Sequence, residues 1–177
     1  MFSERHHDWL RGFRRPLFGY ACALTTDTAS AEDLYHDALV RAMAARSVPV
    51  EQISFRVWMF RILRNLWIDG LRARQRQDAL LDEETGVDCD ARGLTGGEER
   101  VVNQLAVRQA FMLLSKPHRD VLALVDIAGF SYDEAATLLN VPRGTVMSRV
   151  SRARSALACR LAEGPVVALP LRRGRAQ

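Results

Sequence analysis

The residues best suited to chemistry in this chain are arginines, and they gather on a helix predicted from residue 143 to residue 160. That stretch contains five arginines and no acidic residue. Four apolar residues recur at helical spacing and return to one face: Val146, Val150, Leu157 and Leu161. Four of the arginines fall outside that stripe: Arg149, Arg152, Arg154 and Arg160. A helix that docks its apolar stripe on a small domain and turns arginine outward suits the major groove of DNA.

The residues before this helix predict a helix-turn-helix. Asn140 stands where the first helix must end, a position with positive φ that Asn tolerates better than most residues with a side chain. Pro142 stops the first helix and suits the start of the second. Ala136 is small enough for a close crossing, and Val146 is placed to fill the core between the helices. DNA binding is the favoured interpretation, and the alternative is a helical hairpin with a solvated arginine face.

A second basic helix, predicted from Ser54 to Arg76, interleaves aromatic residues with arginines. Bases can stack on aromatic rings while guanidinium groups follow the phosphates, so this composition suits single-stranded nucleic acid. The alternative is an amphipathic helix whose aromatics are core residues, and we favour it for Trp58 and Phe60 individually. Asn65 is a candidate for a hydrogen bond to a base edge, with a structural role as the alternative.

Helical patterns dominate the rest of the chain, which predicts an all-α fold of two small helical domains. The chain has 177 residues, 48% of them hydrophobic, and a net charge of +4. Further helices are expected at 8–25, 30–46, 98–115, 118–128 and 131–139, with the basic helix continuing to 161. Ser30 with Asp33 resembles a capping box, and Gly129 is placed to close a helix.

An acidic stretch marks the boundary between the two domains. Residues 78–99 hold eight acidic residues against Arg92 alone, and four glycines interrupt the pattern between 80 and 97. We therefore expect a first domain at 1–77, a flexible linker at 78–97, a second domain at 98–163 and a tail at 164–177.

Several function classes are disfavoured by the sequence. It has no long apolar run and a polar N-terminus, which predicts cytoplasmic residence without membrane insertion. The three cysteines suggest neither a disulfide framework nor a zinc site. Asp33 and His36 share a helical face, as metal ligands can, but no second helix of that kind is present. With no phosphate-binding loop or nucleophile elbow either, we expect neither an enzyme nor a cofactor.

Three segments of the chain, taken together, resemble the conserved domains of the extracytoplasmic-function (ECF) sigma factors of bacterial RNA polymerase. They are AEDLYHDALVRA at 31–42, FRVWMFRILRNLWIDGLRAR at 55–74 and GFSYDEAATLLNVPRGTVMSRVSRARSAL at 129–157. The resemblance covers nearly all of the chain except the linker and the tail. It implies sigma region 2 in the first domain and sigma region 4 in the second.

The resemblance also implies partners and site residues. The second domain is expected to bind the −35 element of promoter DNA through Arg143, Thr145, Ser148, Arg149, Arg152 and Arg154. The −10 element is expected to be bound and opened by Phe55, Arg56, Arg61, Arg64, Asn65 and Arg72, with the loop from Ser47 to Ser54. The β′ clamp helices of core RNA polymerase are expected to contact Asp33, Leu34, His36, Asp37 and Arg41. The β flap and an anti-sigma factor are further expected partners.

The chain departs from the family pattern at several positions. Met147 stands where Lys or Arg is common, and Asn140 replaces a Gly at the turn. His36 and Asp37 replace a Gln-Glu pair, and the loop SVPVEQIS lacks the usual Phe and Gly. The alternative function is a regulator that binds duplex DNA through its helix-turn-helix without polymerase. Such a protein would leave the aromatic and arginine-rich helix and the acidic linker without a role.

Overall fold

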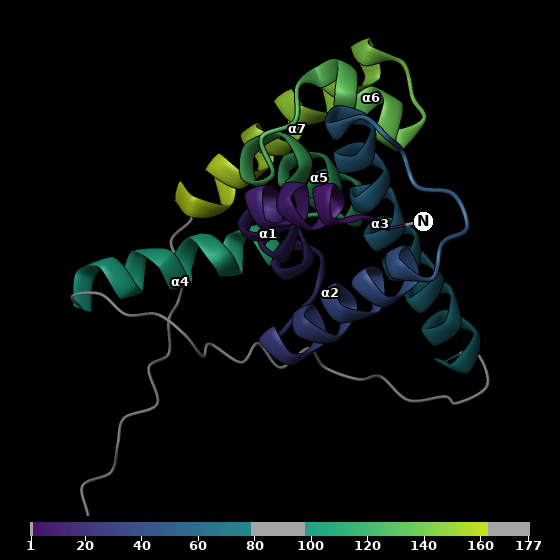
Figure 1. The fold of residues 1–177 in the computed structure, drawn as a ribbon. Coiled ribbons are helices and arrows are strands. Elements are labelled where there is room, and N and C mark those ends of the chain that lie inside the picture. The colour runs from purple at the N-terminus through teal and green to yellow at the C-terminus, as the bar shows by residue number, and fades with distance from the viewer. Residues whose placement is uncertain (1, 79–97, 163–177) are drawn as a thin grey trace, which may run out of the picture.

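The computed structural model describes residues 2–78 and 98–162, and all the regular structure in these ranges is helical, as predicted. The first bundle consists of α1 (Glu4–Leu24), α2 (Thr28–Met43) and α3 (Gln52–Asp78). The second bundle consists of α4 (Glu98–Met112), α5 (Lys116–Leu122), the π-helical segment η1 (Ala123–Ile127), α6 (Tyr132–Leu139) and α7 (Arg143–Ala162) (Figure 1). The linker was predicted at 78–97: Asp78 belongs to α3, and residues 79–97 lie outside the described residues, as does the tail.

Helix α1 bends at Phe13, whose φ of −113° and ψ of 16° are not helical. Pro16 lies three residues later; it has no N–H to donate, and its ring crowds the carbonyl one turn earlier in the helix. The bend keeps the side chains on both sides of it in the core, where Phe13 and Leu17 are buried.

His6 fastens the start of α1 to the loop between α2 and α3. The backbone N–H of Ser3 donates to His6 Nδ1 at 2.9 Å, so that ring nitrogen is an acceptor. The proton of the neutral ring is then on Nε2, which donates to the Pro49 carbonyl at 3.0 Å. His6 is buried, and the contact fixes the middle of the loop to which the sequence assigns base capture.

The start of α2 is capped by Asp27, so the predicted capping box of Ser30 and Asp33 is wrong. The Asp27 side chain accepts hydrogen bonds from the Ser30 backbone N–H at 2.8 Å and from the Ser30 hydroxyl at 2.7 Å. These hydrogen bonds lower the pKa of Asp27. The helix starts earlier than expected because Asp27 satisfies an N–H of its first turn.

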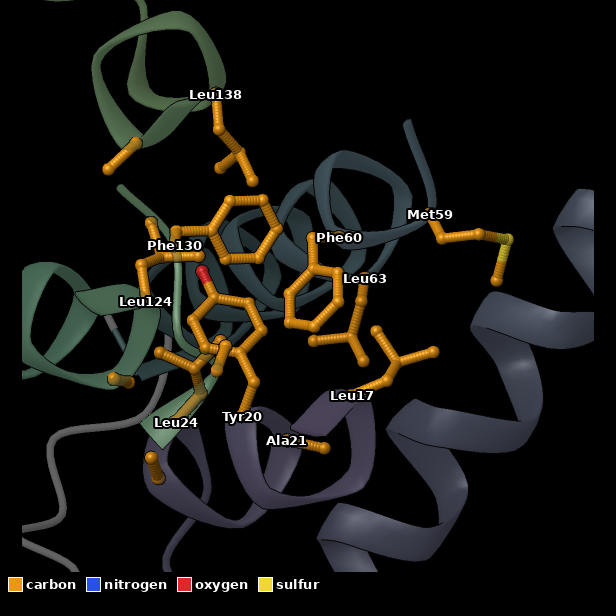
Figure 2. Close-up of a cluster of buried hydrophobic side chains, with 14 of the residues drawn as sticks. Leu17, Tyr20, Ala21, Leu24, Met59, Phe60, Leu63, Leu124, Phe130 and Leu138 are labelled. Atoms are coloured by element: carbon orange, nitrogen blue, oxygen red, sulfur yellow. The ribbon is translucent and has the colours of Figure 1, made fainter. Parts of the chain in front are cut away.

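The two bundles share one hydrophobic core. Helix α1 packs against α5 and η1, and α3 packs against α6. Figure 2 shows Tyr20 of α1 and Phe60 of α3 beside Phe130 and Leu124 of the second bundle. The rings of Phe60 and Phe130 lie 4.7 Å apart, edge to face. The sequence predicted two small helical domains joined by a linker, and gave no information on how they pack; in this structure the two bundles pack against each other.

None of the helices described is long and apolar enough to cross a membrane. In the same ranges, no three His, Cys, Asp or Glu side chains come together as metal ligands. Asp33 and His36 therefore have no third ligand within the part of the chain that the structure describes.

Candidate nucleic-acid and protein interfaces

The predicted helix-turn-helix is formed by α6 and α7. Ser131 and Glu134 make a capping box at the start of α6, with the Ser131 N–H donating to a Glu134 carboxylate oxygen at 2.8 Å. At the end of α6, Asn140 adopts φ 54° and ψ 50°, the left-handed conformation that the sequence predicted. Val146 is fully buried behind the turn, also as predicted. These contacts fix the direction in which α7 leaves the turn.

The arginines of α7 fall into two groups in the structure. Arg143 pairs with Asp133 of α6 at 3.3 Å, and Arg154 pairs with Asp126 of η1 at 2.6 Å. The Arg154 pair is bidentate, and its hydrogen bonds raise the pKa of the guanidinium. Both arginines are therefore tied to the body of the second bundle.

Arg149 and Arg152 have no acidic partner among the described residues. Arg152 is exposed and donates from Nε to the Ser148 carbonyl at 3.2 Å, a contact within its own helix. Ser148 is also exposed, while Thr145 and Arg149 are half-buried at the side of the helix. Met147, where the family often has a cation, is 45% exposed on the same helix. The outward face of α7 is thus formed by Ser148, Arg152 and Met147.

Phe55 is a core residue, so its predicted role at the DNA surface is corrected. It is completely buried in the first bundle, with its ring 5.6 Å from Phe2, 5.0 Å from His6 and 5.7 Å from Trp9. A side chain enclosed by aromatic rings cannot reach a base while this bundle is folded. Phe60 is fully buried too, as favoured from the sequence, and Trp58 is half-buried.

Three arginines assigned to the −10 element contact the second bundle; Arg56 and Arg64 are half-buried there, whereas Arg61 stays exposed. Arg56 donates to the Ala128 carbonyl, and its guanidinium carbon lies 4.2 Å from the centre of the Phe130 ring. Arg61 donates to the Thr137 carbonyl at 3.0 Å. Arg64 pairs with Asp120 at 2.7 Å. These contacts could not be predicted from the sequence, because the partners lie more than fifty residues away in the chain.

The other two −10 residues are open to solvent. Asn65 is exposed, and Arg72 is exposed beside Asp69 at 3.7 Å. A groove of about 480 Å³ lies where the start of α3 faces α6. Its lining residues are Pro49, Ile53, Ser54, Val57, Trp58, Arg61, Asp133, Glu134 and Thr137. One wall thus offers an aromatic ring and an arginine, and the other offers two carboxylates.

The residues assigned to polymerase lie along the outer side of α2, which packs against α1 and α3. Four of them are exposed and Leu34 is half-buried; the exposed four are Asp33, His36, Asp37 and Arg41. Val40 and Met43 lie on the same side and are 67% and 59% exposed, although both are apolar. Neither Val40 nor Met43 was predicted from the sequence, although their helical spacing from His36 places them on this side of α2.

The chain matches two family models. Sigma-70 region 2 matches residues 6–77, and Sigma-70 region 4 matches residues 104–157. The region 2 match spans the first bundle, and the region 4 match contains the helix-turn-helix.

Curated relatives and solved structures agree with these matches. The chain is 32% identical over 145 residues to the ECF RNA polymerase sigma factor EcfG of Rhodopseudomonas palustris, covering 82% of this chain and 78% of that protein. It is 33% identical over 150 residues to the ECF sigma factor SigL of Mycobacterium tuberculosis, covering 83% of each. It also resembles the sigma factor RpoE of Bartonella quintana, solved with the anti-sigma factor NepR. That match has a TM-score of 0.75 and 26% identity, and it covers 92% of this chain and 100% of that one.

Proposed function

Because the chain belongs to the ECF sigma factors of the sigma-70 family, we propose that its two basic helices divide promoter recognition between them. The chain binds RNA polymerase and gives it promoter specificity, as its two sigma regions and its relatives indicate. Sigma factors are initiation factors, so no catalytic residue is assigned. A regulator acting without polymerase is disfavoured because it would need no region 2.

Helix α7 is proposed to read the −35 element through Arg152, Ser148 and Arg149. Arg152 is exposed on the face opposite the buried Val146 and Val150, where a helix docked in the major groove presents its side chains. An arginine there can donate two hydrogen bonds to guanine. Arg143 and Arg154, which are paired with carboxylates, are assigned to phosphates at the sides of the groove.

The −10 element is proposed to lie along α3 and the groove beside the loop from Ser47 to Ser54. Asn65 is exposed and can offer a base both a donor and an acceptor. Trp58 lines the groove and provides a surface on which a base can stack. The arginines Arg56, Arg61, Arg64 and Arg72 follow the same helix and are assigned to the phosphates. The binding energy of an unpaired base would favour the open promoter without ATP.

The outer side of α2 is proposed to bind the β′ clamp helices of core polymerase. It combines exposed charges with the apolar side chains of Val40 and Met43. Exposed apolar side chains rimmed by polar ones are typical of a protein interface. Family membership further supports contact between the second bundle and the β flap.

An anti-sigma factor is proposed as a further partner, and the cytoplasm as the place of action. The Bartonella relative was solved with its anti-sigma factor NepR, and it aligns with 92% of this chain. A partner that covered the sigma regions of this chain would prevent its use of polymerase. Polymerase and promoter DNA are both cytoplasmic in bacteria, which supports the location.

The observation that carries this assignment is the exposed Asn65 on the arginine-rich helix of a region 2 fold. Asn65→Ala should leave the closed complex nearly normal, because duplex contacts come from α7. It should weaken the open complex by roughly 1 kcal/mol or more, since the captured base loses a hydrogen-bonding partner.

Permanganate footprinting of the reconstituted holoenzyme can measure this difference. The variant should fail on duplex promoter DNA and recover substantially on a template melted in advance at the −10 element. Equal defects on both templates would assign Asn65 a structural role and place the base pocket elsewhere.

A further inference from the structure

The loop between α2 and α3 is the part of the first bundle whose shape the helices themselves do not fix. Helix α2 ends at Met43 and α3 begins at Gln52. The backbone hydrogen bonds of this loop lie at its two ends, where the Ala45 N–H donates to the Ala42 carbonyl and the Glu51 carbonyl accepts from Phe55. The middle of the loop therefore depends on other contacts for its position.

His6 supplies a contact to the middle of the loop from 43 residues earlier in the chain. Its Nε2 donates to the Pro49 carbonyl at 3.0 Å, and its Nδ1 accepts from the Ser3 N–H at 2.9 Å. The second bond matters for the first, because a ring that accepts at Nδ1 carries its proton on Nε2. The start of α1 thus presents a hydrogen-bond donor to Pro49.

The imidazole ring of His6 is itself held in place by aromatic side chains. It is 6% exposed, and its centre lies 5.0 Å from the ring of Phe55, 5.3 Å from that of Trp9 and 5.4 Å from that of Phe2. Phe55 is completely buried in the first turns of α3, so the imidazole is packed against the start of that helix. A side chain locked by packing and by a second hydrogen bond positions its partner accurately.

Pro49 connects this contact to the surface assigned to the −10 element. It lines the groove at the start of α3 together with Ile53 and Trp58. The residue before it, Val48, is buried, whereas the residue after it, Val50, is 76% exposed. The chain therefore passes from the core to the surface at Pro49, and the bond from His6 fixes the point at which it emerges. A shift of Pro49 would change the wall of the groove beside Trp58.

We propose that His6 is a positioning residue for promoter recognition: by holding the Pro49 carbonyl, it sets the loop from Ser47 to Ser54 in the shape that accepts the unpaired −10 base. The proposal rests on the assignment of the −10 element to this loop. A loop that is fixed in advance loses less conformational entropy when it binds. The bond from His6 therefore increases the discrimination between bases, although the buried imidazole acts on them only through Pro49.

His6→Asn and His6→Gln separate the two hydrogen bonds of the ring. The longer Gln side chain carries its amide nitrogen about as far as Nε2, so it can still donate to Pro49. The Asn amide ends near the position of Nδ1, so it can still accept from the Ser3 N–H but cannot reach Pro49. Both variants lose the aromatic contacts of the imidazole. A difference between them therefore reports the bond to Pro49, and Gln is the matched control for Asn.

The assay is binding of reconstituted holoenzyme to promoter templates melted in advance, with each unpaired −10 base of the non-template strand changed in turn. His6→Asn should reduce the preference at one position by about three- to tenfold, whereas His6→Gln should stay within about twofold of the natural chain. Neither change should alter the −35 preference, which α7 determines, or the affinity for core polymerase, which α2 determines. Thermal denaturation sets an assay temperature at which every variant is folded.

Pro49→Gly separates the role of His6 from the assignment of the loop, because it loosens the loop directly and keeps the carbonyl. If Pro49→Gly reduces the preference but His6→Asn and His6→Gln behave alike, the loop assignment stands and the positioning role of His6 is overturned. If all three variants keep the full preference, the loop does not capture the base and the proposal falls with that assignment. A loss in His6→Asn and Pro49→Gly, with the preference kept in His6→Gln, supports both.

Discussion

Arg152 and Arg154 lie two residues apart on α7, and the structure predicts a large loss of promoter binding when Arg152 is changed to alanine and little loss when Arg154 is. Arg152 is exposed and has no acidic partner among the described residues. Arg154 is held by Asp126 through two hydrogen bonds, at 3.2 Å and 2.6 Å. The sequence alone assigned both to the −35 element, so this pair tests what the structure adds.

The magnitudes follow from these contacts. An arginine that reads a guanine contributes about 1–3 kcal/mol, so Arg152→Ala should weaken promoter binding roughly 5- to 150-fold. Arg154 and Asp126 are 52% and 41% exposed, a setting in which an ion pair contributes about 0.2–1 kcal/mol to folding. Arg154→Ala should therefore cost a little stability and change promoter affinity by about twofold or less.

The assay is binding of reconstituted holoenzyme to promoter duplexes in which each −35 base pair is changed in turn. Arg152→Ala should remove the preference at one position, while Arg154→Ala should keep the whole preference. Thermal denaturation of both variants controls for misfolding. A larger specificity loss for Arg154→Ala, or full tolerance of Arg152→Ala, would refute the proposed orientation of α7 in the groove.

Three further predictions concern the turn, a helix cap and the polymerase surface. Asn140 has φ 54°, a conformation that Gly adopts easily and Ala does not. Asn140→Ala should therefore lower the free energy of unfolding by about 1 kcal/mol, whereas Asn140→Gly should not. Thermal denaturation measures both, and an Asn140→Gly variant less stable than Asn140→Ala would contradict this. Asp27→Ala should cost about 1 kcal/mol at neutral pH. Because its hydrogen bonds lower the pKa of Asp27, this contribution is present above the unfolded pKa of about 4 and is lost as pH falls through the folded value. Denaturant titrations at several pH values should show the difference shrinking in acid, and a constant difference would exclude the cap. Asp37→Lys should weaken binding to core polymerase and keep stability within about 0.5 kcal/mol. The control Asp8→Lys on α1 should leave both quantities unchanged. If Asp37→Lys binds core polymerase as tightly as the natural chain, Asp37 is not part of the interface.

Local features were predictable from the sequence because their causes are local. Asn140 and Val146 behave as their positions in the turn require, and Gly129 has positive φ at the end of its helix. The capping boxes show the limit of such patterns. The sequence pattern predicts a cap at Ser30, whereas Asp27 satisfies the first turn of α2; the capping box of Ser131 and Glu134 is seen only in the structure. Both sites match short patterns, and only the local geometry selects between them.

The packing of the two bundles could not be predicted in this way. Tyr20 and Asp120 are 100 residues apart, and Arg64 and Asp120 are 56 apart. No periodicity connects residues at such separations, so an arginine that ends in a buried ion pair looks identical in sequence to a solvated one. Phe55 illustrates the same problem: an aromatic residue beside arginine is equally compatible with base stacking and with a core, and its burial decided the matter.

The most direct test of the central claim is a footprint of one target promoter with three samples: core RNA polymerase, this chain, and both together. The claim predicts protection of the −35 and −10 elements, with permanganate-reactive thymines at the −10 element, only when both are present. Neither component alone should protect the DNA, since the chain needs polymerase to engage the promoter. Protection of the duplex by the chain alone, unchanged when polymerase is added, would contradict the account and identify a regulator that acts by itself.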